Sequence, residues 1–155
     1  DTLCQAGAEI RRYPAVKDET DLELALLAAV QHGATWLRIL GAAGGRIDQM
    51  LANIFLLALP ALARCEVRIV SGAQTIWLIG PGDHPVDGVP GDTISLIPLA
   101  GEARGVRTER MVYPLRRETL LFGPARGISN VIESQPARVA LESGWLLVIH
   151  TPGRA

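Results

Sequence analysis

The sequence predicts an α/β region followed by an all-β region, and a change in pattern along the chain leads to this prediction. Residues 1–71 alternate helix-like apolar runs with short strand-like runs, whereas residues 72–155 hold short strand-like runs separated by glycine and proline. An apolar content of 48% is enough to build packed cores in 155 residues. We therefore expect two domains that meet between residues 71 and 72, the first with a mostly parallel sheet and the second an antiparallel β-sandwich.

The first region is predicted to alternate helices and strands. Its clearest helix begins at Thr20, whose hydroxyl can cap it and whose capping box is completed by Glu23, and the helix ends at Gly33. A second helix over residues 47–59 is mostly apolar and is expected to be buried, with Pro60 at its end. The other predicted elements are a helix at 2–7 and strands at 9–13, 35–40 and 67–70. This βαβ order is typical of a Rossmann-like domain, here a partial one.

The second region is divided by turn signals. Ser71-Gly72 and Ser143-Gly144 are expected to be hairpin turns. Residues 80–91 hold three prolines and four glycines and are expected to form a loop. The predicted strands are 75–79, 93–99, 105–110, 119–122, 130–133, 138–142 and 145–150. Strands of this number and spacing favour an antiparallel sandwich.

Charge, hydropathy and cysteine usage narrow the class of protein. The chain has 15 basic and 16 acidic residues, whereas a nucleic-acid-binding protein usually carries a basic excess. The longest apolar stretch, residues 50–63, contains Asn53 and Pro60 and is too short to span a bilayer. Cys4 and Cys65 match no zinc or redox spacing, which favours reduced thiols. We expect a cytoplasmic protein without a nucleic-acid or membrane partner.

The first candidate for chemistry is the charged run Lys17-Asp18-Glu19-Thr20-Asp21 at the start of the predicted helix. Acidic residues in a first turn stabilise a helix through its macrodipole, so capping alone accounts for the run. The alternative is that Asp21 binds a Mg²⁺ that carries a nucleotide, because magnesium favours one or two carboxylates together with phosphate oxygens and water. The run by itself does not separate these two interpretations.

The second candidate is the segment GAAGGRIDQ, from Gly41 to Gln49, between a predicted strand and a predicted helix. Glycines let the backbone approach a ligand closely, and a helix N-terminus attracts anions. Arg46 adds a group that binds anions, and Asp48 adds one that binds cations or amines. A tight strand-to-helix turn is the alternative, and the spacing matches neither a Walker loop nor the dinucleotide fingerprint.

The third candidate is the turn Gly127-Ile128-Ser129-Asn130, which enters a predicted strand. A nucleophile elbow has glycine two residues after its serine, and Val131 stands there instead, which argues against serine hydrolysis. Ser129 and Asn130 carry groups that can hydrogen-bond a ligand. The alternative is a polar turn with no further purpose.

Taken together, these motifs resemble the thiamine pyrophosphokinase family. The segments that carry the resemblance are KDETD followed by LELAL, then GAAGGRIDQMLANIFLL, SLIPLAGEARGVRTERMVYPL and GISN, which span nearly the whole chain. The glycine-arginine-aspartate segment is the most specific of them. The resemblance implies a homodimeric two-domain enzyme, with active sites between subunits, that moves pyrophosphate from ATP to the hydroxyl of thiamine. The products are thiamine diphosphate and AMP, and the cofactor is Mg²⁺.

The resemblance also implies roles for individual residues. The residues expected to act in catalysis are Asp21, Arg46 and Asp48. Those expected to bind ATP and its phosphates are Lys17, Asp18, Thr20, Gly44, Gly45 and Arg46, with Mg²⁺ on Asp21 and Asp18. Those expected to bind thiamine are Asp48, Gln49, Tyr113, Ser129 and Asn130, the last two from the partner's sandwich. An aromatic ring at Tyr113 suits a flat cationic ligand.

In one respect the chain departs from the family pattern. Family members open with a strand, helix and strand that carry an acidic Gly-Asp-x-Asp-Ser signature. The 155 residues of this sequence do not contain that signature. The resemblance therefore predicts an N-terminally incomplete chain whose activity alone is in doubt. Two other functions stay open, a pyrophosphokinase for another heterocyclic alcohol such as a hydroxymethylpterin and a non-catalytic thiamine-binding or dimerisation module. Tyr113, Ser129 and Asn130 favour thiamine over a pterin.

Overall fold

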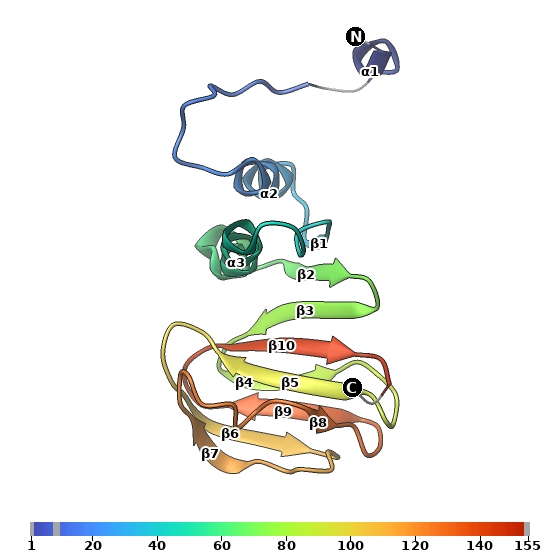
Figure 1. The fold of residues 1–155 in the computed structure, drawn as a ribbon, viewed down its shortest axis with the longest axis vertical. Coiled ribbons are helices and arrows are strands. Elements are labelled where there is room, and N and C mark those ends of the chain that lie inside the picture. Colours follow the sequence, from blue (N-terminus) through green and yellow to red (C-terminus); the bar gives the residue numbers. More distant parts are fainter. Residues whose placement is uncertain (1, 8–9, 154–155) are drawn as a thin grey trace.

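The computed structural model describes residues 2–7 and 10–153. Helices lie toward one end of the elongated molecule, and strands build the rest (Figure 1). The helices are α1 (Thr2–Gln5), α2 (Asp21–Gln31), α3 (Ile47–Phe55) and the short 3-10 helices η1 (Leu56–Ala58) and η2 (Pro60–Leu62). The strands are β1 (Trp36–Leu40), β2 (Glu66–Ser71), β3 (Gln74–Ile79), β4 (Gly82–Val86), β5 (Thr93–Pro98), β6 (Ala103–Glu109), β7 (Arg116–Leu120), β8 (Asn130–Val131), β9 (Ala137–Leu141) and β10 (Leu146–Thr151). Within the described residues, no helix has the length and hydropathy needed to cross a membrane.

Two sheets carry the fold. The first, here called sheet A, has the strand order β1-β2-β3-β10-β5-β8, and the second, sheet B, has the order β4-β9-β6-β7. In sheet A only β1 and β2 pair in parallel, and the other described pairs are antiparallel. The expected Rossmann-like, mostly parallel sheet is therefore wrong for the described residues. The reason is the tight turn after Ser71, which returns the chain as β3 beside β2 and extends the same sheet antiparallel.

Sheet A is covered on both faces at β3 and β10, because successive side chains of a strand point to opposite faces. Leu146 and Val148 of β10 face sheet B and belong to the sandwich core. Leu147, between them, belongs to a second core under α2 and η1, where it joins Leu26 and Leu57. The helices therefore cover one face of sheet A, and sheet B covers the other face farther along.

Helix α2 begins and ends where the sequence predicts. Thr20 is its N-cap residue, and the Thr20 Oγ1 accepts a hydrogen bond of 3.2 Å from the backbone N–H of Glu23. Gly33 has φ of +84°, a left-handed conformation that glycine adopts without steric cost and that ends the helix.

The second predicted helix, expected to run buried to residue 59, differs from the structure. Helix α3 ends at Phe55, and the chain tightens into η1. No residue of α3 is buried, because Ile47, Leu51 and Phe55 recur every four residues and face solvent together. Leu56 and Leu57, which follow α3, are buried in the core, and Ile54 and Leu59 pack against it partly buried.

Several shorter predictions were also wrong. Residues 10–13 form no strand, and residue 9 lies outside the described residues. The predicted loop at 80–91 contains β4, which tolerates Pro85 because β4 is an edge strand of sheet B and needs fewer backbone donors. Ser143-Gly144 is not a hairpin turn, since it joins β9 of sheet B to β10 of sheet A. Strand β7 begins three residues before the predicted 119–122.

Candidate functional site

The acidic run before α2 is exposed. Lys17 Nζ lies 2.7 Å from Asp21 Oδ1, and the Asp21 side chain is 94% exposed. Asp18 is exposed as well, while the Thr20 hydroxyl is occupied as the helix cap. Among the described residues, no group of three or more His, Cys, Asp or Glu side chains is arranged to hold a metal ion. The run therefore offers two carboxylates to a ligand but does not form a closed metal site.

The glycine-rich segment forms a left-handed turn between β1 and α3. Gly44 has φ of +116° and Gly45 has φ of +67°, values that other residues rarely adopt. The following Arg46 is the N-cap residue of α3, but its side chain makes no capping hydrogen bond. Gln49, one turn into the helix, is exposed. The Arg46 side chain therefore does not cap α3, and the backbone N–H groups of Asp48 and Gln49 donate to the Asp48 carboxylate instead.

Arg46 and Asp48 form a bidentate ion pair at the start of α3. Arg46 Nε donates to Asp48 Oδ1 at 3.1 Å, and Arg46 Nη2 donates to Asp48 Oδ2 at 2.5 Å. The hydrogen bond from Arg46 lowers the pKa of Asp48, and the same bond raises the pKa of Arg46. Both side chains are more than half exposed, so the pair stays open to a competing anion.

Asn53 is a residue whose contribution to this turn the sequence did not reveal. Its Nδ2 donates a 3.0 Å hydrogen bond to the backbone oxygen of Ala42, which fixes the glycine-rich segment against α3. The only sequence signal was an amide inside an otherwise apolar stretch, and that signal does not name the partner.

The turn at residues 127–130 is held closely against β5. The Gly127 oxygen accepts a 2.8 Å hydrogen bond from the Leu96 N–H, and a Cβ at Gly127 would lie 2.3 Å from the Leu96 oxygen. Ser129 is exposed and has φ of +57°, and its N–H donates to Ser95 Oγ at 3.1 Å. A non-glycine residue in this conformation is strained, and such strain is frequent at functional sites.

Asn130 and Tyr113 lie together beside this turn. Asn130 is only 5% exposed, whereas the Tyr113 side chain is 52% exposed. The Asn130 side chain bonds both the N–H and the oxygen of Tyr113, at 3.0 and 2.7 Å. The structure thus brings Tyr113, Ser129 and Asn130 into one group on the sandwich.

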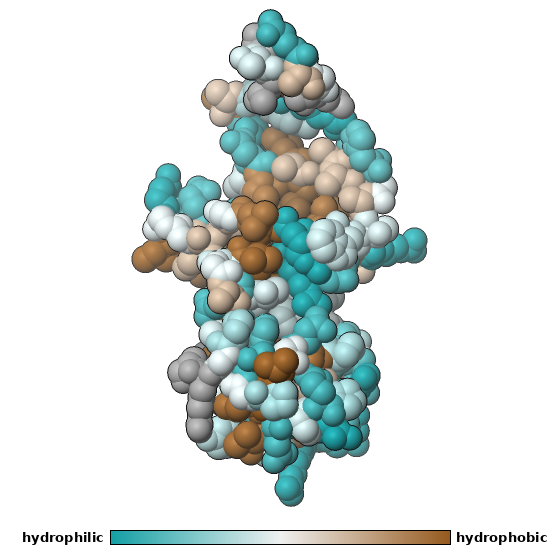
Figure 2. All heavy atoms as spheres, turned by 90° about the vertical axis from the view of Figure 1, so that its right-hand side faces the viewer, coloured by the Kyte–Doolittle hydropathy of each residue, from teal (hydrophilic) through white to brown (hydrophobic). Residues whose placement is uncertain are grey.

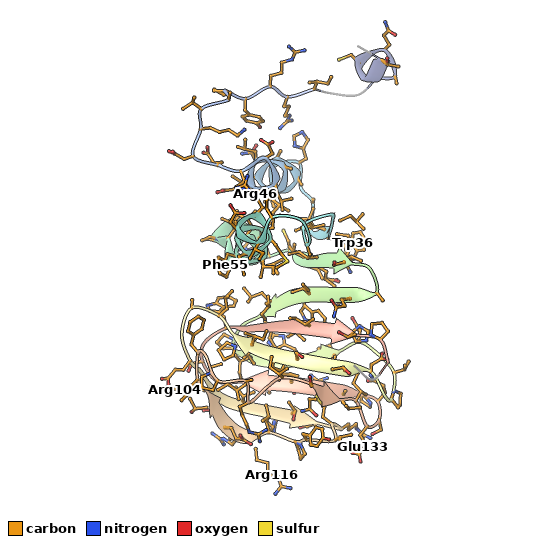
Figure 3. All side chains as sticks on the ribbon, in the orientation of Figure 1. Trp36, Arg46, Phe55, Arg104, Arg116 and Glu133 are labelled. Carbon is orange, nitrogen blue, oxygen red and sulfur yellow. The ribbon has the colours of Figure 1, made fainter. Side chains whose placement is uncertain are left out.

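The group of Tyr113, Ser129 and Asn130 lies far from the turn at residues 41–46, here called the Arg46 turn. Asn130 is on β8 and the Arg46 turn follows β1, and these strands are the opposite edges of sheet A. Five strand spacings of about 4.8 Å separate the two edges by roughly 24 Å. Figure 3 shows Arg46 beside α3, while Glu133, three residues after Asn130, lies on the lower part of the sandwich. One chain does not bring the two halves of the predicted site together.

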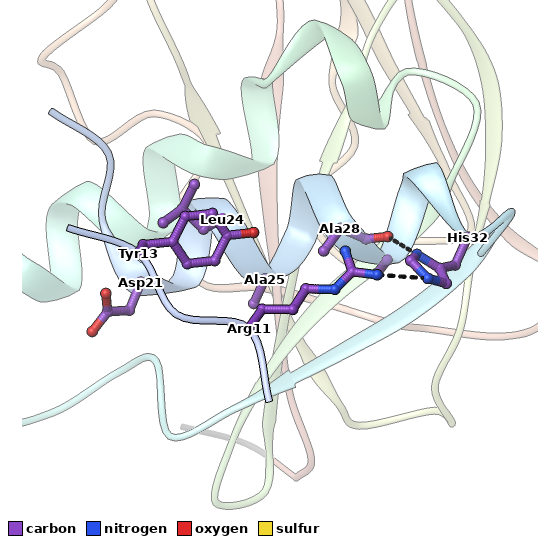
Figure 4. A pocket seen from close by; sticks show the side chains of 8 residues that line it. Arg11, Tyr13, Asp21, Leu24, Ala25, Ala28 and His32 are labelled. Atoms are coloured by element: carbon purple, nitrogen blue, oxygen red, sulfur yellow. Dashed lines mark hydrogen bonds between the residues drawn. The ribbon is translucent and has the colours of Figure 1, made fainter. Parts of the chain in front are cut away.

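A pocket that the sequence did not predict lies over α2. It has a volume of about 490 Å³ and is lined by Arg11, Tyr13, Asp21, Leu24, Ala25, Ala28, Ala29 and His32. In Figure 4, Arg11 reaches from the extended segment to His32, with 2.8 Å between Arg11 Nη2 and His32 Nε2. Because the arginine only donates, His32 Nε2 accepts, and the ring proton on Nδ1 goes to the Ala28 oxygen. Asp21 is the one predicted site residue in this pocket.

Comparison with known families gives two matches in sequence order. A family model described as "Thiamin pyrophosphokinase, catalytic domain" matches residues 1–69. A second, described as "Thiamin pyrophosphokinase, vitamin B1 binding domain", matches residues 83–146. The first matched range holds the acidic run and the Arg46 turn, and the second holds Tyr113, Ser129 and Asn130.

Curated relatives and solved structures agree with these matches. Thiamine pyrophosphokinase of Bacillus subtilis is 28% identical over 148 residues, which cover 95% of this chain and 69% of the relative. Thiamine pyrophosphokinase 1 of Oryza sativa subsp. japonica is 23% identical over 154 residues, covering 92% of this chain and 57% of the relative. The crystal structure of the B. subtilis protein superposes with a TM-score of 0.82 at 28% identity, over 88% of this chain and 65% of that one. That of the Geobacillus thermodenitrificans protein gives a TM-score of 0.81 at 29% identity, over 97% and 69%. The chain thus spans between 57% and 69% of the length of these proteins.

Proposed function

Because the chain belongs to the thiamin pyrophosphokinase family, we propose that it is a transferase that moves pyrophosphate from ATP to the hydroxyl of thiamine. The observation that carries this proposal is the Arg46–Asp48 pair, which lies exposed at a helix start directly after a left-handed glycine turn. A guanidinium at a helix N-terminus is suited to bind a polyphosphate.

The reaction asks the protein mainly for positioning and for charge neutralisation. The thiamine hydroxyl oxygen forms a bond to the β-phosphorus of ATP, the bond from that phosphorus to the oxygen shared with the α-phosphorus breaks, and AMP leaves. The hydroxyl proton passes to water in the same exchange, and the β- and γ-phosphates stay together on thiamine. Arg46 would release Asp48 and bind phosphate oxygens as charge moves onto the leaving AMP. Asp48, whose pKa is lowered, stays ionised and would face the cationic thiamine together with Gln49.

Magnesium fits the donor atoms at the start of α2. Asp21 and Asp18 are exposed carboxylates, and Mg²⁺ commonly takes one or two such groups when phosphates supply the remaining oxygens. Bound there, the ion would neutralise phosphate charge. Lys17, now paired with Asp21, would be free to bind the same phosphates, and Gly44 and Gly45 leave room for them. Thr20 would contribute by fixing the start of α2 rather than by contact, since its hydroxyl is engaged.

The proposal includes a homodimer. The phosphate-binding turn and the Tyr113 group lie at opposite edges of sheet A, roughly 24 Å apart, which is longer than thiamine. In a two-fold dimer, each surface of one chain can meet the other surface of its partner, which closes two equivalent sites. Tyr113, Ser129 and the Asn130 region would then complete the site of the partner chain.

The same proposal assigns residues 1–71 to ATP and residues 72–155 to thiamine. The two family models support this division, since they match 1–69 and 83–146. A cytoplasmic location belongs to the proposal as well, and it is supported by Cys4 and Cys65, which are not joined in a disulfide.

The decisive experiment incubates the chain with ATP, Mg²⁺ and thiamine and quantifies AMP and thiamine diphosphate by chromatography. We expect the two products in equal amounts. Arg46→Ala should lower the rate about 100-fold, because it removes a charge that stabilises the transition state. Arg64→Ala is the matched control, since Arg64 is an exposed arginine of the same half without a proposed role.

Two outcomes would contradict this function. Release of ADP, or formation of AMP without thiamine, would exclude pyrophosphate transfer to thiamine. Thiamine binding without any product, unchanged by Asp21→Ala, would instead support the non-catalytic module.

A further inference from the structure

The side chain of Asn130 is fully engaged inside the protein. Its Oδ1 accepts hydrogen bonds from the N–H of Tyr113, at 3.0 Å, and from the N–H of Val131, at 2.9 Å. Its Nδ2 donates to the Tyr113 oxygen at 2.7 Å. With two acceptor bonds, one donor bond and 5% exposure, the amide has little capacity left for a ligand.

The segment that Asn130 holds is the connection between β6 and β7. Backbone hydrogen bonds join this connection to the residues that follow Asn130, from Val112 N–H to the Val131 oxygen and from Glu133 N–H to the Arg110 oxygen, both 2.9 Å. A second buried side chain, Thr108, accepts from the Leu115 N–H at 2.8 Å through its Oγ1. Tyr113 therefore stands on a backbone fixed from both sides, with half of its side chain exposed to solvent.

We infer that Asn130 is a positioning residue, which fixes the backbone of Tyr113 so that the tyrosine ring is presented to thiamine. This inference rests on the proposed function and changes one part of it, since Asn130 acts through Tyr113 and does not touch the ligand. Pre-organised aromatic groups bind more tightly because less conformational freedom is lost on binding.

Ser95 fixes the backbone of Ser129 in the same way that Asn130 fixes the backbone of Tyr113. The Ser95 hydroxyl accepts the N–H of Ser129, whose φ of +57° needs such support, and Ser129 remains exposed. In this inference two side chains, Tyr113 and Ser129, face the ligand. Two others, Asn130 and Ser95, fix the backbone of these ligand-facing residues.

The test is a double-mutant cycle on thiamine affinity, measured by titration calorimetry on the full chain. Tyr113→Ala should weaken binding about tenfold, through loss of the ring face. Asn130→Ala should weaken it about fivefold in the unaltered chain but by less than about twofold beside Tyr113→Ala, because residues that act through one another are not additive. Ser129→Ala is the control, and its effect should be the same in both backgrounds.

A milder variant guards against loss of folding, since Asn130 is buried. Asn130→Ser keeps one small oxygen that can accept an N–H from this segment, adds no charge to the buried site, and loses the donor to the Tyr113 oxygen. Its effect should be smaller than that of Asn130→Ala and should also vanish beside Tyr113→Ala. Hydrogen exchange should show faster exchange of the Tyr113 amide in this variant, with the amides of β10 unchanged.

The outcomes separate this inference from the proposed function. If the unaltered chain does not bind thiamine, the proposed function itself is wrong. If it binds and Asn130→Ala costs the same factor with and without Tyr113, then Asn130 contacts the ligand and the positioning role is overturned.

Discussion

The two halves of the chain bury their side chains to different extents. Of the ten largest described side chains with under 2% exposure, nine belong to residues 72–155, and Ile69 alone belongs to residues 1–71. On the face seen in Figure 2, apolar atoms gather at the level of α2 and β1, whereas the sandwich below is mainly polar. The difference follows from architecture, since the sandwich closes one sheet on another, while the helices cover only one face of sheet A.

The same contrast holds at the predicted site. On the sandwich, Asn130 is buried and hydrogen-bonded at both ends. In the helix-bearing half, Asp21 is exposed and bonds Lys17, and Arg46 and Asp48 are exposed and bond each other. Exposed ion pairs contribute little to stability, so they can exchange partners readily. If the proposed roles hold, the thiamine side (Tyr113, Ser129 and Asn130) is built in advance, whereas the phosphate side (Asp21, Arg46 and Asp48) is free to rearrange around its ligand.

The largest expected effect tests the difference between the two cores. Leu146→Ala, at a fully buried position of the sandwich core, should reduce the free energy of unfolding by about 3–4 kcal/mol. Leu57→Ala, 7% exposed in the core under the helices, should reduce it by about 2 kcal/mol, since that site can relax toward solvent. Urea unfolding followed by circular dichroism measures both. Equal losses would mean that the two cores are equally rigid.

The features of the fold that the sequence could predict are those set by neighbours in the chain. Thr20 and Gly33 bound α2 through contacts within a few residues, and the turn after Ser71 needs only a left-handed glycine. The antiparallel sandwich could likewise be predicted from strand number and spacing. The conformation at Ser143-Gly144 could not be predicted in this way. Strand β10 pairs with β3 and β5, which are distant in the sequence, and this pairing places it in sheet A and not beside β9.

The motifs indicate candidate site residues, and their ligand-binding roles stay a prediction, but the motifs do not show which of these residues hold others in place. The polar residues of the turn at 127–130 mark it as a candidate for ligand binding. Nothing local shows that Asn130 reaches back 17 residues to Tyr113, or that Asn53 reaches back to Ala42. Both hydrogen bonds form only once sheets and helices have packed. The sequence therefore shows which residues are polar but not which backbone groups they bond.

A smaller effect concerns the buried carboxylate that ties the sandwich half to its own C-terminal strand. Backbone N–H groups of Gly153 and Val89, and then His150 Nε2–H, donate to Asp92 and lower its pKa to about 2. Because the folded pKa lies below the ordinary value of 3.8, the stabilisation is fully present only well above that value, from about pH 5, and is lost as pH falls toward 2.

Asp92→Asn should therefore cost about 2 kcal/mol at pH 7, and the stability of the variant should change less between pH 4 and pH 2. Thermal unfolding across this pH range measures both. A variant that keeps the full acid dependence in this window would show that other carboxylates cause it.

The smallest expected effect belongs to the Arg46–Asp48 ion pair, on the proposed phosphate side. Asp48→Asn should leave the Tm within about 2 °C of the unaltered chain, because both partners are solvated in the folded and unfolded states. Asp83→Asn is the matched change on the sandwich, since Asp83 bonds Arg138 at 3.0 Å and is also partly exposed. If both variants keep their Tm, the contrast between the halves comes from burial alone. A Tm drop of more than about 5 °C in Asp48→Asn would instead show that the pair holds α3 in place, and the phosphate side would then be as pre-built as the thiamine side.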